Sequence, residues 1–87
     1  MISKLVIKGK ERVEVKNLTK FIHKASRFKS LISIEKDERK ANGKSLMGLL
    51  ALAVKGGDSI SIIVEGEDER EAIEALAKFI NNNFDDK

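Results

Sequence analysis

Apolar and polar positions follow two periods along the chain, and the period-two segments predict four strands. β-Branched and apolar residues predict strands over Ile2–Lys8, Leu31–Ile34 and Ser59–Glu65, the last as the clearest alternating run, S-I-S-I-I-V-E. The polar run Lys36–Arg39 is typical of a turn, and it predicts a short return strand over Lys40–Asn42. The four strands are therefore short, and each has only one strongly apolar face.

The remaining segments have the helical period. The first predicted helix covers Leu18–Arg27, with Asn17 as its N-cap, and the second covers Leu46–Val54, with Ser45 as its N-cap and Gly56-Gly57 after its end. A capping-box-like pair, Asp68 and Glu71, precedes the third helix. The apolar stripe of this third helix consists of Ala72, Ala75, Leu76, Phe79 and Ile80.

The predicted order is thus βαββαβα. Four half-apolar strands and three amphipathic helices bury their apolar faces together if all three helices cover one face of an antiparallel sheet. No proline, low-complexity tract or internal repeat marks a linker. We therefore expect one α+β domain over residues 1–87, a four-stranded antiparallel sheet with three helices on one face.

Composition narrows the possible chemistry. Charged residues make up 36% of the 87 residues and apolar residues 41%, as in globular proteins, and no apolar stretch is long enough to span a bilayer. No cysteine is present, which excludes disulfides, thiolate zinc sites and cysteine nucleophiles, and the single histidine has no ligand cluster around it. We expect no metal, no cofactor, no membrane insertion and no enzymatic activity, and a cytoplasmic location because the N-terminus does not resemble a secretory signal.

Charge is distributed unevenly along the chain. Residues 1–29 hold nine Lys or Arg residues and two acidic residues, a net charge of +7, whereas residues 30–87 carry −4. Lys16, Lys20, Lys24 and Arg27 fall on one stripe of the first helix. Such a stripe is usually a solvated face, but it also suits an acidic partner protein or, alternatively, a nucleic acid.

Several segments resemble the HPr-like phosphocarrier family of the phosphoenolpyruvate:sugar phosphotransferase system. Gly43–Leu50, G-K-S-L-M-G-L-L, resembles the regulatory-serine segment K-S-I/L-M-G, on the expected helix of the same βαββαβα order. Ala25–Phe28 is similar to the family's A-S-K-Y/F, and Lys55–Asp58 to its K-G-A-E. The resemblance covers nearly the whole chain and implies the HPr-like open-faced β-sandwich.

The chain departs from the family pattern at the active centre. In this register the family's G-I-H-A-R-P-A falls on Arg12–Leu18, so Glu14 replaces the phosphoryl-accepting histidine, Lys16 the arginine and Asn17 the proline. The resemblance therefore implies a divergent, Crh-like member without a catalytic residue. Ile22–Ala25 also looks like I-H-A, but aligning His23 there would remove about eight residues of the first helix, so His23 is interpreted as a surface residue.

Ser45 is the candidate regulatory residue. Its hydroxyl is placed to cap the second helix, and the resemblance implies that it is also a phosphorylation site, as the corresponding serine is in Gram-positive HPr and in Crh. Both roles are compatible at one helix start. The implied partners are an HPr kinase/phosphorylase and a transcription regulator or metabolic enzyme, in catabolite repression and the regulation of sugar transport.

A partner-binding surface is expected beside Ser45. The resemblance places a docking patch on the second helix and near the start of the first, formed by Lys16, Thr19, Lys20, Leu46, Met47 and Leu50. Core packing is the alternative for the apolar members, although Leu49, Leu52 and Ala53 are better candidates for the core. A small basic nucleic-acid-binding domain is the alternative function, and the lack of Trp and Tyr speaks against it. We expect a monomer, with a dimer as the alternative.

Overall fold

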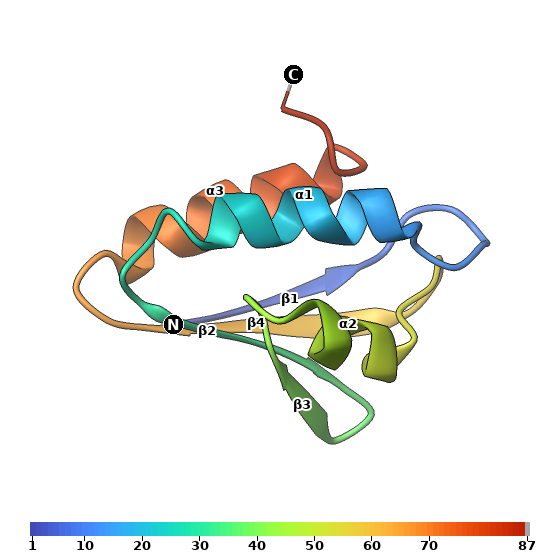
Figure 1. The fold of residues 1–87 in the computed structure, drawn as a ribbon, viewed down its shortest axis with the longest axis horizontal. Coiled ribbons are helices and arrows are strands. Elements are labelled where there is room, and N and C mark those ends of the chain that lie inside the picture. Colours follow the sequence, from blue (N-terminus) through green and yellow to red (C-terminus); the bar gives the residue numbers. More distant parts are fainter. Residues whose placement is uncertain (87) are drawn as a thin grey trace.

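A computed structural model describes residues 1–86 and has seven regular elements in the order βαββαβα (Figure 1). They are β1 (Ile2–Val6), α1 (Val15–Ala25), β2 (Leu31–Lys36), β3 (Arg39–Asn42), α2 (Leu46–Leu52), β4 (Ser59–Glu65) and α3 (Glu69–Asn81). No helix within residues 1–86 is long and apolar enough to cross a membrane. The predicted number, type and order of the elements are confirmed.

The four strands form one antiparallel sheet in the order β1-β4-β2-β3. Strand β4 lies in the interior of the sheet, where Ile63 pairs with Ile2 on one side and with Ser33 on the other. The long helices α1 and α3 lie side by side over the sheet, and α2 lies nearer to β3 (Figure 1). This arrangement confirms the predicted two-layer α+β class.

The core lies between the sheet and the helices. Alternation along β4 buries Ile60, Ile62 and Val64, whereas the residues between them face outward. Helix α1 contributes Leu18 and Phe21 to the same core. Of the stripe predicted for α3, four residues are buried and Ala75 is half-buried; the four are Ala72, Leu76, Phe79 and Ile80.

Helix α1 begins three residues before the predicted start, so the expectation that Asn17 is its N-cap is wrong. Glu14 occupies the cap position in extended conformation, and its carbonyl accepts from the N–H groups of Asn17 at 2.9 Å and Leu18 at 3.1 Å. The Glu14 side chain makes no capping hydrogen bond. Water can instead hydrogen-bond the free N–H groups of the exposed first turn. Because no side chain caps the helix, residue types alone do not indicate where it begins.

Helix α2 ends at Leu52, before the glycines that were expected to terminate it. Ala53 takes the left-handed conformation, with φ 52° and ψ 50°, and its N–H donates to the Leu50 carbonyl at 3.0 Å. A residue other than glycine is strained in this conformation, so another contact has to hold it. The ammonium of Lys36 supplies that contact, because it donates to the carbonyls of Leu52 and Ala53 at 3.1 and 2.9 Å.

Asp68 precedes α3 as predicted, but the capping box with Glu71 is not formed. Its carboxylate instead accepts from the N–H groups of Lys29 and Ser30 at 2.8 and 3.0 Å and from the Ser30 hydroxyl at 2.5 Å. These hydrogen bonds, that from the hydroxyl first, lower the pKa of Asp68 below its usual value. Asp68 therefore links the start of β2 to the start of α3, a long-range role that local spacing does not predict.

Candidate functional site

The segment before α1 is held against the connection between α2 and β4. The Val13 N–H donates to the Val54 carbonyl at 3.0 Å, and the Gly56 N–H donates to the Glu11 carbonyl at 2.9 Å. A Cβ atom at Gly56 would overlap the backbone of Gly9, so glycine is required for this close approach. Two chain segments far apart in sequence thus present Glu14 at the start of α1.

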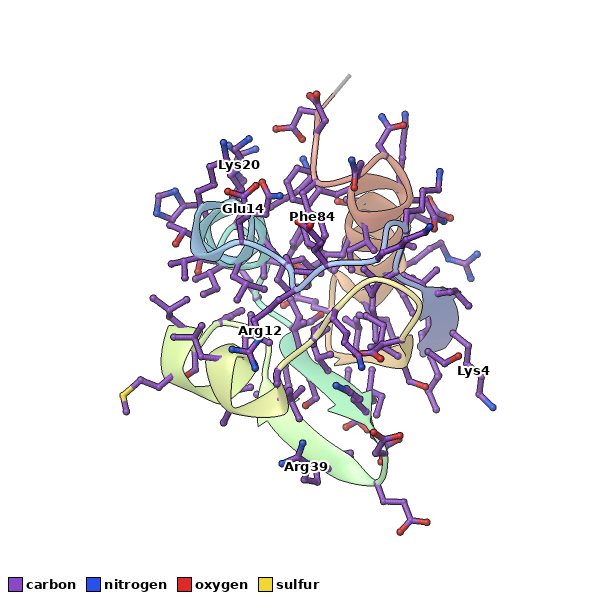
Figure 2. All side chains as sticks on the ribbon, turned by 90° about the vertical axis from the view of Figure 1, so that its right-hand side faces the viewer. Lys4, Arg12, Glu14, Lys20, Arg39 and Phe84 are labelled. Carbon is purple, nitrogen blue, oxygen red and sulfur yellow. The ribbon has the colours of Figure 1, made fainter. Side chains whose placement is uncertain are left out.

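Glu14 is exposed at this start, beside an open hollow of about 460 Å³. Figure 2, which looks along α1, shows Glu14 and Lys20 at this helix and Phe84 between α1 and α3. The buried ring of Phe84 and the side chain of Asn17 line the hollow together with the loop after β1. A carboxylate at this place lacks the nucleophilic ring nitrogen by which a histidine accepts a phosphoryl group.

Ser45 is the N-cap of α2, as predicted. Its Oγ accepts from the Gly48 N–H at 3.2 Å, and its carbonyl accepts from the Leu49 N–H at 3.1 Å. The neighbouring Lys44 is directed away, since its ammonium donates to the Phe28 carbonyl at 2.7 Å. The Ser45 side chain is partly exposed, so its hydroxyl lies at the surface as well as in the cap.

Helix α2 divides its apolar residues between the core and the surface. Leu49 and Leu52 are buried in the core as expected, whereas Ala53, the C-cap, is only half-buried and lies outside the core cluster. Met47 is 82% exposed and Leu50 is 43% exposed. Leu46, the third apolar residue of the predicted patch, is half-buried against the core. We call Leu46, Met47 and Leu50 the α2 patch. Exposed apolar side chains this close together on seven residues of helix are typical of a contact surface.

The basic stripe of α1 is not uniformly free. Lys16 and Lys20 are exposed, and Thr19 between them is half-buried, its hydroxyl donating to the Val15 carbonyl at 3.0 Å. Lys24, in contrast, pairs with Asp86 at 2.6 Å and lies 5.2 Å from the centre of the Phe79 ring. The hydrogen bond from Lys24, with the positive charges nearby, keeps the pKa of Asp86 below its usual value. Of the four residues in the stripe, Lys16, Lys20 and Arg27 are therefore exposed, whereas Lys24 is held by Asp86.

His23 follows Thr19 and Lys20 by one helical turn on α1. It is exposed in the last turn of α1, as interpreted from the sequence. Within residues 1–86, no three His, Asp or Glu side chains are grouped so that they could hold a metal ion.

One buried contact that supports the site was not predicted. Lys36, at the end of β2, forms an ion pair of 2.8 Å with Asp58, and both side chains are largely buried. The hydrogen bond from Lys36 lowers the pKa of Asp58 despite an opposing effect of burial. Since Lys36 also binds the last carbonyls of α2, this pair fixes the position of the helix that carries Ser45. No local pattern in the sequence indicates this pair, because its two residues are far apart along the chain.

Comparison with known proteins agrees with the fold and with the sequence resemblance. The family PTS-HPr, described as "PTS HPr component phosphorylation site", matches residues 3–82. HPr-like protein Crh from Halalkalibacterium halodurans is 47% identical, over 92% of this chain and 96% of its own, and HPr-like protein Crh from Bacillus subtilis is 40% identical, over 88% and 91%.

Solved structures give the same result. The crystal structure of HPr-C-His from Thermoanaerobacter tengcongensis superposes with a TM-score of 0.92 at 37% identity, covering 100% of this chain and 98% of that one. The crystal structure of Bacillus subtilis Crh, described as a dimer with a swapping domain, gives a TM-score of 0.77 at 39% identity, with 92% of each chain covered. This chain belongs to the HPr family of the phosphotransferase system, and the Crh proteins are among its similar relatives.

Proposed function

We propose that this protein is a regulatory and interaction member of the HPr family and not a histidine phosphocarrier. Two residues together support the proposal. Glu14 is exposed at the start of α1, where the family has its histidine, and Ser45 is partly exposed at the start of α2. The first position offers no imidazole to a phosphoryl donor, whereas the second offers a hydroxyl to a kinase. Modification of Ser45 would therefore act as the switch.

The position of Ser45 is compatible with a phosphate. The hydroxyl already accepts from a backbone N–H of α2, so a negatively charged group there would keep a favourable contact with the start of the helix. The added charge would lie beside the α2 patch, where Met47 is the most exposed large apolar side chain of the described residues. A partner that contacts the patch would thus meet different charges before and after modification.

The partner surface that we propose combines the α2 patch with Lys16, Thr19 and Lys20. Its apolar part suits a hydrophobic protein contact, and its basic part suits acidic side chains. The expected partners are an HPr kinase/phosphorylase and a transcription regulator or metabolic enzyme of catabolite repression. The ion pair between Lys24 and Asp86 interrupts the basic stripe and so favours a protein over a nucleic acid.

Phosphorylation by an HPr kinase/phosphorylase with ATP, followed by intact mass and peptide mapping, tests the proposal. One phosphate on Ser45 is expected, and none in Ser45→Ala. Met47→Gln is expected to lower kcat/KM for the kinase about tenfold or more, whereas Leu31→Gln, at a residue 74% exposed on β2, should leave it unchanged. A phosphate elsewhere, no phosphate, or an equal effect of the two glutamine variants would contradict the proposal.

A further inference from the structure

The face of the sheet that the helices leave open carries an ordered pattern of charge. Ser59, Ser61 and Ile63 of β4 point outward, because the residues between them are buried. The strand register places Lys4 of β1 on one side of Ser61 and Glu35 of β2 on the other. Lys4 lies on the side of the molecule away from Glu14 and Lys20, as Figure 2 shows, so this face is separate from the proposed partner surface.

A trough of about 420 Å³ follows β4 on this face. Its floor contains the small side chains of Ser59 and Ser61; Lys4 lies on its β1 side and Glu35 on its β2 side, the latter with the acidic turn residues Asp37 and Glu38. Within residues 1–86, neither Lys4 nor Glu35 forms an ion pair. The trough therefore has one positive wall and one negative wall, both available to a partner.

We propose that this face binds a second copy of the same chain, with the two-fold axis parallel to β4. Rotation about such an axis places β1 opposite the partner's β2. Lys4 then faces the partner's Glu35, and Glu35 faces the partner's Lys4, so one type of contact occurs twice. A partner of a single charge sign would be repelled by one wall, whereas a second copy complements both.

One apolar contact, between the two copies of Ile63, agrees with the same axis. Ile63 lies on the axis and meets its equivalent in the partner, and Ile2, which is 63% exposed, faces the partner's Ser33. The serine floor lets two sheets approach to the roughly 10 Å of face-to-face sheet packing. At one end of β4, Glu65 meets its equivalent and opposes association.

Sedimentation equilibrium of the full chain at low ionic strength tests the proposal, and a dimer is expected to form below about 1 mM. Lys4→Glu and Glu35→Lys should each weaken it about tenfold or more, because symmetry turns each substitution into two like-charge contacts. An equimolar mixture of the two variants should regain the wild-type dissociation constant, since every facing pair in the mixed dimer has opposite charges. Glu65→Gln should tighten the dimer a few fold.

Three results would overturn the proposal. One is a monomer throughout the concentration range. Another is a dimer that neither charge reversal weakens, such as one made by exchange of a strand between copies. The third is a mixture of the Lys4→Glu and Glu35→Lys variants that dimerises no better than each alone. Circular dichroism of each variant verifies that the substitutions leave the fold intact.

Discussion

The Lys36–Asp58 pair gives a quantitative test of how α2 is held in place. Replacing Lys36 by methionine keeps most of the side-chain volume but removes the ammonium. Three contacts are lost together, at 2.8 Å to the Asp58 carboxylate and at 3.1 and 2.9 Å to the carbonyls of Leu52 and Ala53. The carboxylate and the last turn of α2 then lose their shared donor.

The size of the effect follows from burial. The Lys36 and Asp58 side chains are 11% and 15% exposed, so water replaces the lost donor only in part. A hydrogen bond to a charged group contributes about 1.5–3 kcal/mol, and loss of one partner of a fully buried pair costs about 3–5 kcal/mol. Because this pair retains some exposure, we expect Lys36→Met to lower the free energy of unfolding by about 2–3 kcal/mol.

Urea unfolding followed by circular dichroism measures this difference, and Lys40→Met, at an exposed position of the same hairpin, is the matched control. The control should change the free energy of unfolding by no more than about 0.5 kcal/mol. Amide hydrogen exchange of α2 should also become faster in Lys36→Met than in the control. Equal stability of the two variants would refute the view that Lys36 anchors α2.

Three further predictions concern Gly66, Phe84 and the pH dependence of the Lys36–Asp58 pair. Gly66 has φ +152° and a Cβ there would lie 2.6 Å from the Ser30 Oγ, so Gly66→Ala should lower the free energy of unfolding by about 2 kcal/mol or more in urea. Phe84→Ala should cost about 3 kcal/mol, because the ring is buried at the base of the hollow beside Glu14; a loss below about 1 kcal/mol would contradict this. The folded-state pKa of Asp58 is lowered from 3.8. The ion pair with Lys36 therefore stabilises the protein fully above pH 3.8, and this stabilisation is lost as the pH falls through the folded-state pKa. The stability of Asp58→Asn should therefore vary less with pH below about 4 than that of the wild type, and parallel pH curves would be inconsistent with this role.

Local pattern was sufficient for the elements and their order. The alternation in β4 and the apolar stripe of α3 directly reflect which side chains face the core, so both were predicted correctly. The ends of helices were predicted less well because distant groups determine them. Helix α2 ends where the ammonium of Lys36 stabilises a left-handed Ala53, and Asp68 turns from its own helix toward Ser30. Neither contact has a signature at a fixed sequence spacing.

In the candidate site, too, the local features were predicted from the sequence and the long-range contacts were not. Ser45 was predicted as an N-cap from its residue type and neighbours, and its geometry confirms that role. The exposure of Met47 was suggested only by family resemblance, since periodicity on a short helix does not separate core from surface. The pairing of Lys24 with Asp86 brings together residues 62 positions apart, so the break in the basic stripe required the folded chain.

The most direct test of the central proposal compares two phosphoryl donors on the wild-type protein by intact mass. One sample contains phosphoenolpyruvate and enzyme I, and the other contains ATP and an HPr kinase/phosphorylase. No acid-labile phosphate is expected in the first sample, and one phosphate, mapped to Ser45, is expected in the second. Phosphorylation by enzyme I, at His23 or at Glu14, together with an unmodified Ser45, would contradict it.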